Sequence, residues 1–505
     1  MLQSKLTPSE FSEIAAEIIP GVAHLLPELI LTVVACALIV SDLLIKRNDS
    51  RFTMGILALS GLVAAFFYAI DGFGESQLIF GGMVTIDPFS AFFKAIFIGS
   101  TAIVVIFSML YEPFRGRRMG EYFAILLCAV VGMCLMASAS NLLMFYLSLE
   151  MVSILSYILV VFLRQSRAGS EASLKYVIYG SVASGLMIFG LSIFYGLTGS
   201  TDLAAIGMAF ETSTDLFTLS IASVLVLAGF AYKMSVVPMH FWCPDVYEGA
   251  PTPITAWLSV ASKAAGFAMF VRFLVVGFSG PIQSAGVSLD IEWTSLVAGL
   301  SFATMTLGNL AALWQESAKR LLAYSSIAHA GYLMMGVALF QQEGFPGFQP
   351  VAFYFLVYLF MNLGAFGVVI FVENRLGTDR LEDYKGLGYR APFLAFMLTI
   401  FLISLIGLPP TGGFTGKFQL IAAAVNGDLL WLAIAAGVNT AISLWYYARI
   451  IRRMYLESMD DVSPLHIPLS AKVMTALLAI PVIYLGIFFE GAAKITQGLT
   501  IFGAP

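Results

Sequence analysis

Residues 231–267 read AYKMSVVPMHFWCPDVYEGAPTPITAWLSVASKAAGF, and residues 405–420 read LIGLPPTGGFTGKFQL. Each stretch lies within a long apolar run and places proline in the middle of it, at Pro238 and at Pro409 and Pro410. Proline removes a backbone donor and clashes with the preceding turn, so we expect a broken helix at both places. The runs, 216–243 and 393–426, would be ~42 Å and ~51 Å long as straight helices, more than the ~30 Å of a bilayer core.

The composition of the chain is that of a membrane protein. Of 505 residues, 59% are hydrophobic and 11% are charged, whereas a soluble domain carries roughly 25% charged residues. No basic stripe or tail indicates nucleic-acid binding. The four cysteines lie in or beside apolar runs without CxxC spacing, so we expect no metal or redox centre in this chain.

Continuous apolar runs predict an all-α polytopic protein, and they exclude a membrane barrel, whose strands alternate. We expect about fourteen transmembrane helices. They lie near 23–45, 52–70, 86–110, 121–139, 141–163, 172–197, 216–243, 253–278, 293–314, 320–340, 350–373, 393–426, 429–456 and 470–490.

The Lys and Arg residues are unevenly divided between alternate loops. Cytoplasmic loops carry an excess of these residues, so the richer set is expected to face the cytoplasm. The outer side holds two of the 26, Lys5 and Lys494, and both termini are therefore expected there. The cytoplasmic side holds Lys46, Arg47, Arg51, Arg115, Arg117, Arg118, Arg164, Arg167, Lys319, Arg320, Arg375, Arg380, Lys385, Arg390, Arg449, Arg452, Arg453 and Lys472.

The two broken helices are the seventh and the twelfth, five helices apart. A unit of five crossings must invert when it is repeated in tandem, and paired broken helices in inverted repeats point to a transport site. We therefore expect two repeats, helices 4–8 within 116–280 and helices 9–13 within 281–460. Residues 1–115 would hold helices 1–3, and 461–505 the last helix. Unrelated proline kinks are the alternative reading.

Charged residues within the spans are where a function is expected, because burying a charge in the bilayer costs at least ~2.5–3.5 kcal/mol. Glu150 lies deep in its span, Lys233 and Lys417 lie beside the two breaks, and Lys263 lies near the midplane. A buried lysine can give up its proton, whereas an arginine stays protonated. Structural ion pairing is the alternative, but one carboxylate cannot neutralise three lysines.

Other polar residues within the spans have less distinctive settings. Lys175 is close enough to the cytoplasmic end for its amine to reach the interface, and Lys94 and Arg272 are expected to do the same or to form ion pairs. His240 follows Pro238, and His329 lies in KRLLAYSSIAHAGY (319–332). Each histidine would relay protons near neutral pH or would be a satisfied buried side chain.

The two opening stretches, with LSLEMVSILSY (147–157) and KRLLAYSSIAHAGY, resemble the antiporter-like membrane subunits of proton-pumping NADH–quinone oxidoreductase, respiratory complex I. The wording VYEGAPTPITAWLSVASK (246–263) is most similar to the subunit N group. The resemblance extends over nearly the whole chain. It implies fourteen helices, two inverted five-helix repeats, and a hydrated polar axis along the membrane midplane.

The resemblance also implies roles for individual residues. Glu150 and Lys233 would form a tunable pair, Lys263 would be the central proton carrier, and Lys417 would face the second half-channel. Lys175 and His240 would assist proton uptake and relay, and His329 would belong to the central axis. Either Tyr446 or Tyr447 would line the second channel.

The implied partners are the other membrane and peripheral subunits of complex I, in a bacterial inner membrane. NADH, FMN, iron–sulfur clusters and quinone would bind to those partner subunits and none of them to this chain. Two alternatives stay open. One is a subunit of a multisubunit cation/proton antiporter or a membrane-bound hydrogenase, and the other is a scaffold that transports nothing.

Overall fold

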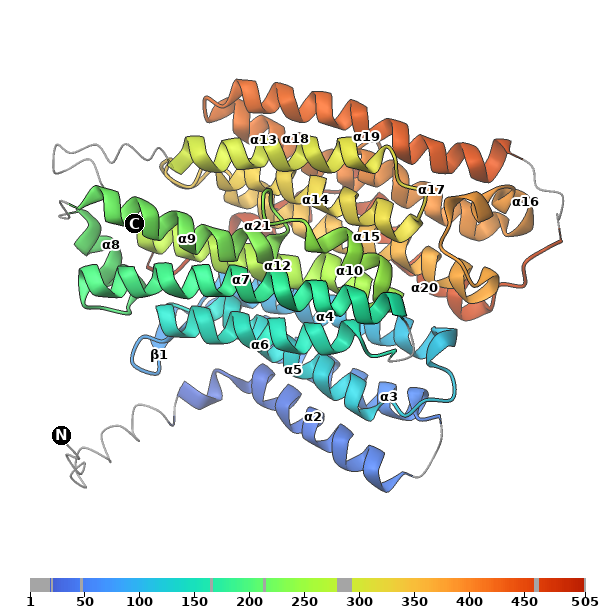
Figure 1. Ribbon diagram of the computed structural model, residues 1–505, viewed down its shortest axis with the longest axis horizontal. Coiled ribbons are helices and arrows are strands. Elements are labelled where there is room, and N and C mark those ends of the chain that lie inside the picture. The colour runs from blue at the N-terminus through green and yellow to red at the C-terminus, as the bar shows by residue number, and fades with distance from the viewer. Residues whose placement is uncertain are drawn as a thin grey trace.

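The computed structural model describes residues 19, 21–45, 49–163, 167–211, 215–278, 293–457 and 463–503. Lys5, Lys46, Arg47 and Arg164, which contribute to the topology prediction, lie outside these residues. The described chain is almost entirely helical, and its long helices run side by side (Figure 1). The expected all-α, multi-span fold is confirmed.

Twelve helices of the described chain are long and apolar enough to cross a membrane. Each matches a run predicted from the sequence. They are α2 (Leu26–Leu44), α3 (Arg51–Asp71), α4 (Pro88–Leu110), α5 (Gly120–Ser138), α6 (Leu142–Val160), α7 (Arg167–Thr198), α9 (Leu216–Met234), the continuous run α11–η3–α12 (Thr252–Trp257, Leu258–Ser262, Lys263–Phe278), α13 (Trp293–Ala312), α15 (Phe348–Leu376), α19 (Leu430–Leu456) and α20 (Leu469–Ile487).

Two further predicted runs are helical but lie outside that set. The first is α14 (Ala318–Val337), which is almost wholly buried and carries many polar side chains. The second consists of two short helices, α17 (Pro392–Ile406) and α18 (Gly412–Asn426). Every run predicted from the sequence is therefore helical.

Both predicted breaks are present. The first separates α9, which ends at Met234, from α10 (Trp242–Gly249), and Ser235 takes a left-handed conformation with φ of 59° at the end of α9. The second separates α17 from α18, and Gly407 ends α17 with φ of 87°. Glycine adopts this conformation without the steric cost that a side chain adds.

The helices pack as two similar groups. One comprises α5, α6, α7, α9–α10 and α11–α12, and the other comprises α13, α14, α15, α17–α18 and α19. Corresponding pairs are in contact in both: α5 on α6 as α13 on α14, α7 on α9 as α15 on α17, and α5 on α12 as α13 on α19. This packing supports the predicted repeats.

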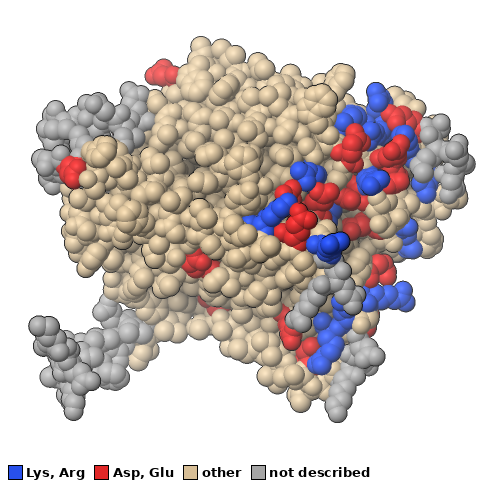
Figure 2. Space-filling view, viewed as in Figure 1, with Lys and Arg blue, Asp and Glu red and all other residues tan. Residues whose placement is uncertain are grey.

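The two ends of the bundle differ in charge. In the view of Figure 2, Lys and Arg gather at one end, where Figure 1 places α16 (Leu387–Arg390). The short elements η2 (Glu112–Phe114) and η5 (Leu381–Tyr384) belong to the basic loops of this end. We call it the basic end.

The opposite end carries small elements that were not predicted. A hairpin of β1 (Gln77–Ile79) and β2 (Val84–Ile86) pairs Leu78 with Thr85. Helix α8 (Leu203–Glu211) follows α7, and Figure 1 shows α8 and β1 at this end. Helix α21 (Glu490–Gln497) follows α20.

Candidate functional site

Three of the five lysines that are buried in the described part of the chain are those predicted to take part in proton translocation. The exposed fractions of Lys233, Lys263 and Lys417 are 1%, 2% and 4%. None of the three makes an ion pair with a described residue; their amines contact hydroxyl or carbonyl oxygens instead. A buried ammonium group without a counter-ion is costly, so these positions are not explained by structural ion pairing.

The first lysine lies in the last turn of α9, just before the break. Lys233 Nζ donates to Ser153 Oγ of α6 at 3.3 Å. Glu150 lies one turn earlier on α6, and its carboxylate accepts from the Ser184 hydroxyl of α7. Lys233 therefore contacts α6 one turn away from Glu150 without forming an ion pair with it. The action of the two residues as a tunable pair stays a prediction.

The second lysine begins α12, directly after the π-helical turn η3. Such turns are rare in proteins, and many of those that occur lie at functional sites. Lys263 Nζ donates to Ser326 Oγ of α14 at 2.7 Å. The amine also lies 5.8 Å from the centre of the Tyr247 ring of α10, so α10 and α14 both contact it.

The third lysine belongs to α18 and binds the end of α17 across the second break. Lys417 Nζ donates to the carbonyl oxygens of Leu405 and Ile406 at 3.1 and 3.0 Å. These are among the last carbonyls of α17, which have no partner within their own helix and carry the negative end of its dipole. The break thus supplies the polar environment of Lys417.

Helix α14 connects the second and third lysines. Its polar residues Ser326, His329 and Tyr332 recur every three residues, a spacing that keeps them on neighbouring parts of one face. His329 Nδ1 and the Tyr354 hydroxyl lie 2.6 Å apart. The Tyr332 ring lies 4.3 Å from Lys417 Nζ. One buried face therefore extends from Lys263 to Lys417.

The two tyrosines of α19 face different partners. The Tyr447 hydroxyl contacts the Ser325 hydroxyl and lies 3.5 Å from His329 Nε2. The Tyr446 hydroxyl donates instead to Asn309 Oδ1 of α13 at 3.0 Å. Tyr447 is thus the one that contacts the polar face of α14.

The two residues suggested for proton uptake lie near α10. Lys175 Nζ forms ion pairs with Glu171 and Asp245, both at 2.8 Å, and Arg320 binds Asp245 from α14 at 2.9 Å. Lys175 is therefore paired and half-exposed at the basic end. His240 is buried in the break between α9 and α10, and its Nδ1 has no hydrogen-bond partner among the described residues.

The remaining two basic residues within the spans form ion pairs, which is one of the two outcomes expected from the sequence. Lys94 Nζ lies 2.7 Å from a carboxylate oxygen of Glu28. Arg272 binds both carboxylate oxygens of Asp87 at 2.8 Å. In this respect Lys94 and Arg272 differ from Lys233, Lys263 and Lys417, which form no ion pair with a described residue.

Several residues of the site were not identified from the sequence: Ser326, Tyr247, Tyr332 and Tyr354. Tyrosine and serine are common in apolar helices, so their presence gave no signal. The spacing of polar residues along α14 was visible in the sequence and would have indicated Ser326 and Tyr332 together with His329.

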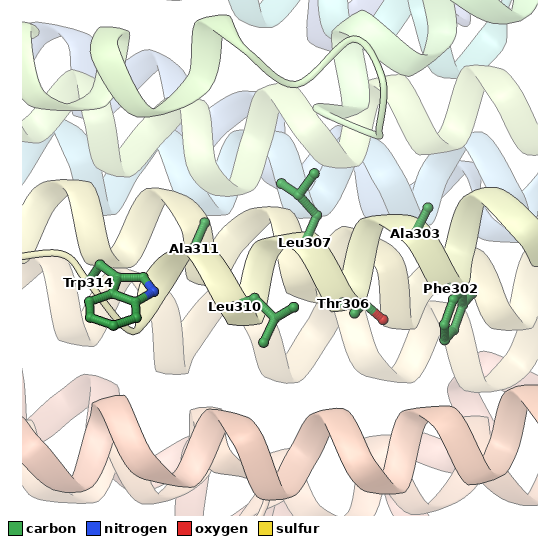
Figure 3. A pocket seen from close by; sticks show the side chains of 7 residues that line it. All are labelled: Phe302, Ala303, Thr306, Leu307, Leu310, Ala311 and Trp314. Atoms are coloured by element: carbon green, nitrogen blue, oxygen red, sulfur yellow. The ribbon is translucent and has the colours of Figure 1, made fainter.

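A surface pocket of about 500 Å³, which none of these lysines lines, is lined by residues of α13 and by Trp314 just after it. Figure 3 shows Thr306 between Phe302 and Leu310 on this face. The lining is almost entirely apolar, which is typical of a helix face in lipid. Among the described residues no group of His, Cys, Asp and Glu side chains could hold a metal ion.

Comparisons with known proteins agree with this architecture. Residues 139–443 match the family described as NADH:quinone oxidoreductase/Mrp antiporter, TM. The protein named NADH-quinone oxidoreductase subunit N 2 of Chloroherpeton thalassium is 42% identical, over 98% of this chain and 98% of its own.

Solved structures show the same fold. A chain of respiratory complex I from Thermus thermophilus is 28% identical with a TM-score of 0.78, covering 94% of this chain and 100% of that one. A chain of the Mrp complex from Dietzia sp. is 22% identical with a TM-score of 0.79, covering 94% and 96%, and shares the fold. The chain therefore belongs to the NADH:quinone oxidoreductase/Mrp antiporter family of membrane proteins, as a member of its subunit N group.

Proposed function

We propose that this chain translocates protons as a membrane subunit of NADH–quinone oxidoreductase. The observation that carries the proposal is the buried polar face of α14, which joins two unpaired lysines, Lys263 and Lys417. A buried lysine can alternate between charged and neutral forms, and hydroxyl and imidazole groups can pass a proton between two such sites.

The proposed sequence of events starts outside this chain. Quinone reduction on a partner subunit sends an electrostatic change along the membrane midplane. Glu150 and Lys233 respond by changing their separation. When they are apart, each has a neutral partner, because Ser184 contacts Glu150 and Ser153 contacts Lys233. The altered charge near Lys263 changes its proton affinity, and a proton moves along Ser326 and His329 toward Lys417.

The same proposal places the chain in the bacterial inner membrane with its basic end in the cytoplasm and both termini on the outer face. NADH, FMN, the iron–sulfur clusters and quinone belong to partner subunits. Lys175 lies at the basic end and His240 lies in the break between α9 and α10. Both would serve proton uptake.

Substitution of Lys263 by arginine tests the central step. Arginine keeps the charge but stays protonated, so Lys263→Arg should assemble yet pump at least about tenfold more slowly, as expected for loss of a proton-transfer group. NADH-driven proton uptake into inverted vesicles measures this, and NADH–quinone activity should fall in parallel.

Lys94→Arg is the matched control for this experiment. Lys94 is equally buried but is paired with Glu28, so it needs only a charge, and its arginine variant should pump normally. Wild-type proton-to-electron stoichiometry in a well-assembled Lys263→Arg enzyme would overturn the role of Lys263 and would favour a scaffold.

A cation/proton antiporter is the second candidate, and the likeness in fold to the Mrp chain favours it. The two candidates differ in their partner chains. Purification in mild detergent should recover subunits that carry NADH-binding and iron–sulfur domains. Recovery of membrane subunits alone would support the antiporter.

A further inference from the structure

A cavity of about 380 Å³ lies at the basic end, and none of the buried lysines lines it. The N-terminal ends of α3 and α20 and the C-terminal ends of α4 and α15 surround it. Three arginines from three separate segments line it: Arg51, Arg115 and Arg375.

One wall of this cavity is formed by the ion pair of Arg51 and Asp49, whose charges cancel. Arg51 binds Asp49 through Nε and a terminal nitrogen at 3.1 and 3.2 Å, and it also donates to the Tyr111 carbonyl at 3.1 Å. Burial alone raises the pKa of Asp49, but hydrogen bonds from Arg51 and Gly116 outweigh it and hold that pKa below its ordinary value. Asp49 therefore stays ionised and is matched by Arg51.

A second wall is fixed by Asn374. Its amide nitrogen donates to the Leu110 carbonyl at 2.9 Å, and its amide oxygen accepts from the Glu112 backbone at 2.9 Å. These bonds tie the end of α4 to the end of α15. The cavity between them is therefore formed before any ligand binds.

The remaining positive charge is available for a ligand. Arg375 makes no ion pair with a described residue, and Arg115 reaches Glu112 only at 3.7 Å with both side chains largely exposed. Helix α20 begins beside them without a side-chain cap, and its N-terminal dipole adds to the positive potential.

The outer side of the cavity is apolar. Phe52, which is 51% exposed, lines it, and Leu469, between the lining residues Pro468 and Ser470, is 75% exposed. Basic pockets between transmembrane helices at the cytoplasmic surface bind anionic lipid headgroups. An acidic peptide or free phosphate would not use the exposed apolar side.

We propose that this cavity binds one anionic phospholipid of the cytoplasmic leaflet, with its phosphate between Arg115 and Arg375 and an acyl chain against Phe52. The leaflet follows from the orientation given under the proposed function, whereas binding itself does not depend on proton transport.

The intact complex, incubated with vesicles of phosphatidylcholine containing photoreactive phosphatidylglycerol, tests this site. In the wild type, cross-links should map to peptides that contain residues 109–115, 371–375 or 468–473. Arg375→Gln should reduce that signal about fivefold, the contribution of one basic residue near an anionic lipid surface, and Arg375→Lys should restore most of it.

Arg452→Gln is the matched control, because Arg452 is an exposed arginine of the same end that does not line the cavity. Its cross-linking should match the wild type. Each of the following results would overturn the proposal: no cross-link to these peptides, an equal signal in Arg375→Gln, an equal loss in Arg452→Gln, or full competition by inorganic phosphate. A partner subunit's acidic segment cross-linked at this place would also overturn it. Normal pumping throughout would leave the lipid result unaffected.

Discussion

The six basic residues within the spans differ in what surrounds their charge. Lys94, Arg272 and Lys175 contact carboxylates. The amines of the other three form no ion pair with a described residue and donate to hydroxyl or carbonyl oxygens. A carboxylate partner fixes a charge in place, while a neutral partner allows it to be lost and regained. This difference in partners is the reason that we assign proton exchange to the second group.

Removal of Lys233 should impair pumping more than neutralisation of Glu150. Lys233→Ala removes a buried charge from a side chain that lies beside Gly266 of α12, one turn after Lys263, whereas Glu150→Gln leaves Lys233 bound to Ser153. We expect at least about a tenfold loss of proton uptake in the first variant and a smaller loss in the second. Native gels should show normal assembly of both, and full pumping by Lys233→Ala would remove this residue from the mechanism.

The contacts of the two α19 tyrosines lead to a second comparison. Tyr447→Phe removes a hydroxyl that contacts Ser325 and His329, whereas Tyr446→Phe removes a bond to Asn309 of α13. One hydrogen bond contributes roughly 1 kcal/mol, so we expect about a fivefold loss of pumping for Tyr447→Phe and little for Tyr446→Phe. Equal rates in vesicles would show that the hydroxyl of Tyr447 is not part of the path.

The sequence identified the charged members of the site but not their neutral partners. Lys233, Lys263 and Lys417 stood out because a charge in an apolar run is expensive. Tyr354 did not, because its importance depends on a contact with His329, 25 positions away in the chain. Long-range contacts of this kind cannot be obtained from local spacing.

At the scale of elements, α13 and α14 approach each other through glycine. A Cβ atom added at Gly331 would lie 2.4 Å from the Met305 backbone nitrogen, whereas at Gly437 of α19 it would meet open space. Alanine favours a helix over glycine by about 1 kcal/mol at either position. A loss of stability in Gly331→Ala would therefore come from the clash alone.

We expect Gly331→Ala to destabilise the complex by about 1–3 kcal/mol, and Gly437→Ala to leave it unchanged or slightly more stable. Thermal unfolding of the detergent-purified complex measures both variants under the same conditions. Equal unfolding temperatures would show that the two helices can separate without cost.

Long elements were predictable and short ones were not. Every apolar run became a helix, and both breaks occur where proline interrupts a run longer than the bilayer is thick. The hairpin β1–β2 and the helices α8 and α21 were missed, because three to nine residues carry too little periodicity to separate them from loops.

At the scale of the whole molecule, the charge asymmetry predicts orientation. Positions 117 and 380 belong to loops of the basic end and should be inaccessible from outside the cell. Single cysteines at these positions, in a background lacking Cys36, Cys128, Cys134 and Cys243, should react with an impermeant reagent only in inverted vesicles. Reaction in intact cells would reverse the orientation and the direction of transport proposed above.

The polarity of α14 has a consequence for how the protein is made. This helix is not among those apolar enough to cross a membrane alone, so the insertion machinery would not retain it in the bilayer as an isolated segment. It is joined to the apolar α13 by a loop of only five residues, 313–317. The two are therefore expected to enter the membrane together as a hairpin, and α14 becomes fully enclosed only after α15, α18 and α19 have been synthesised.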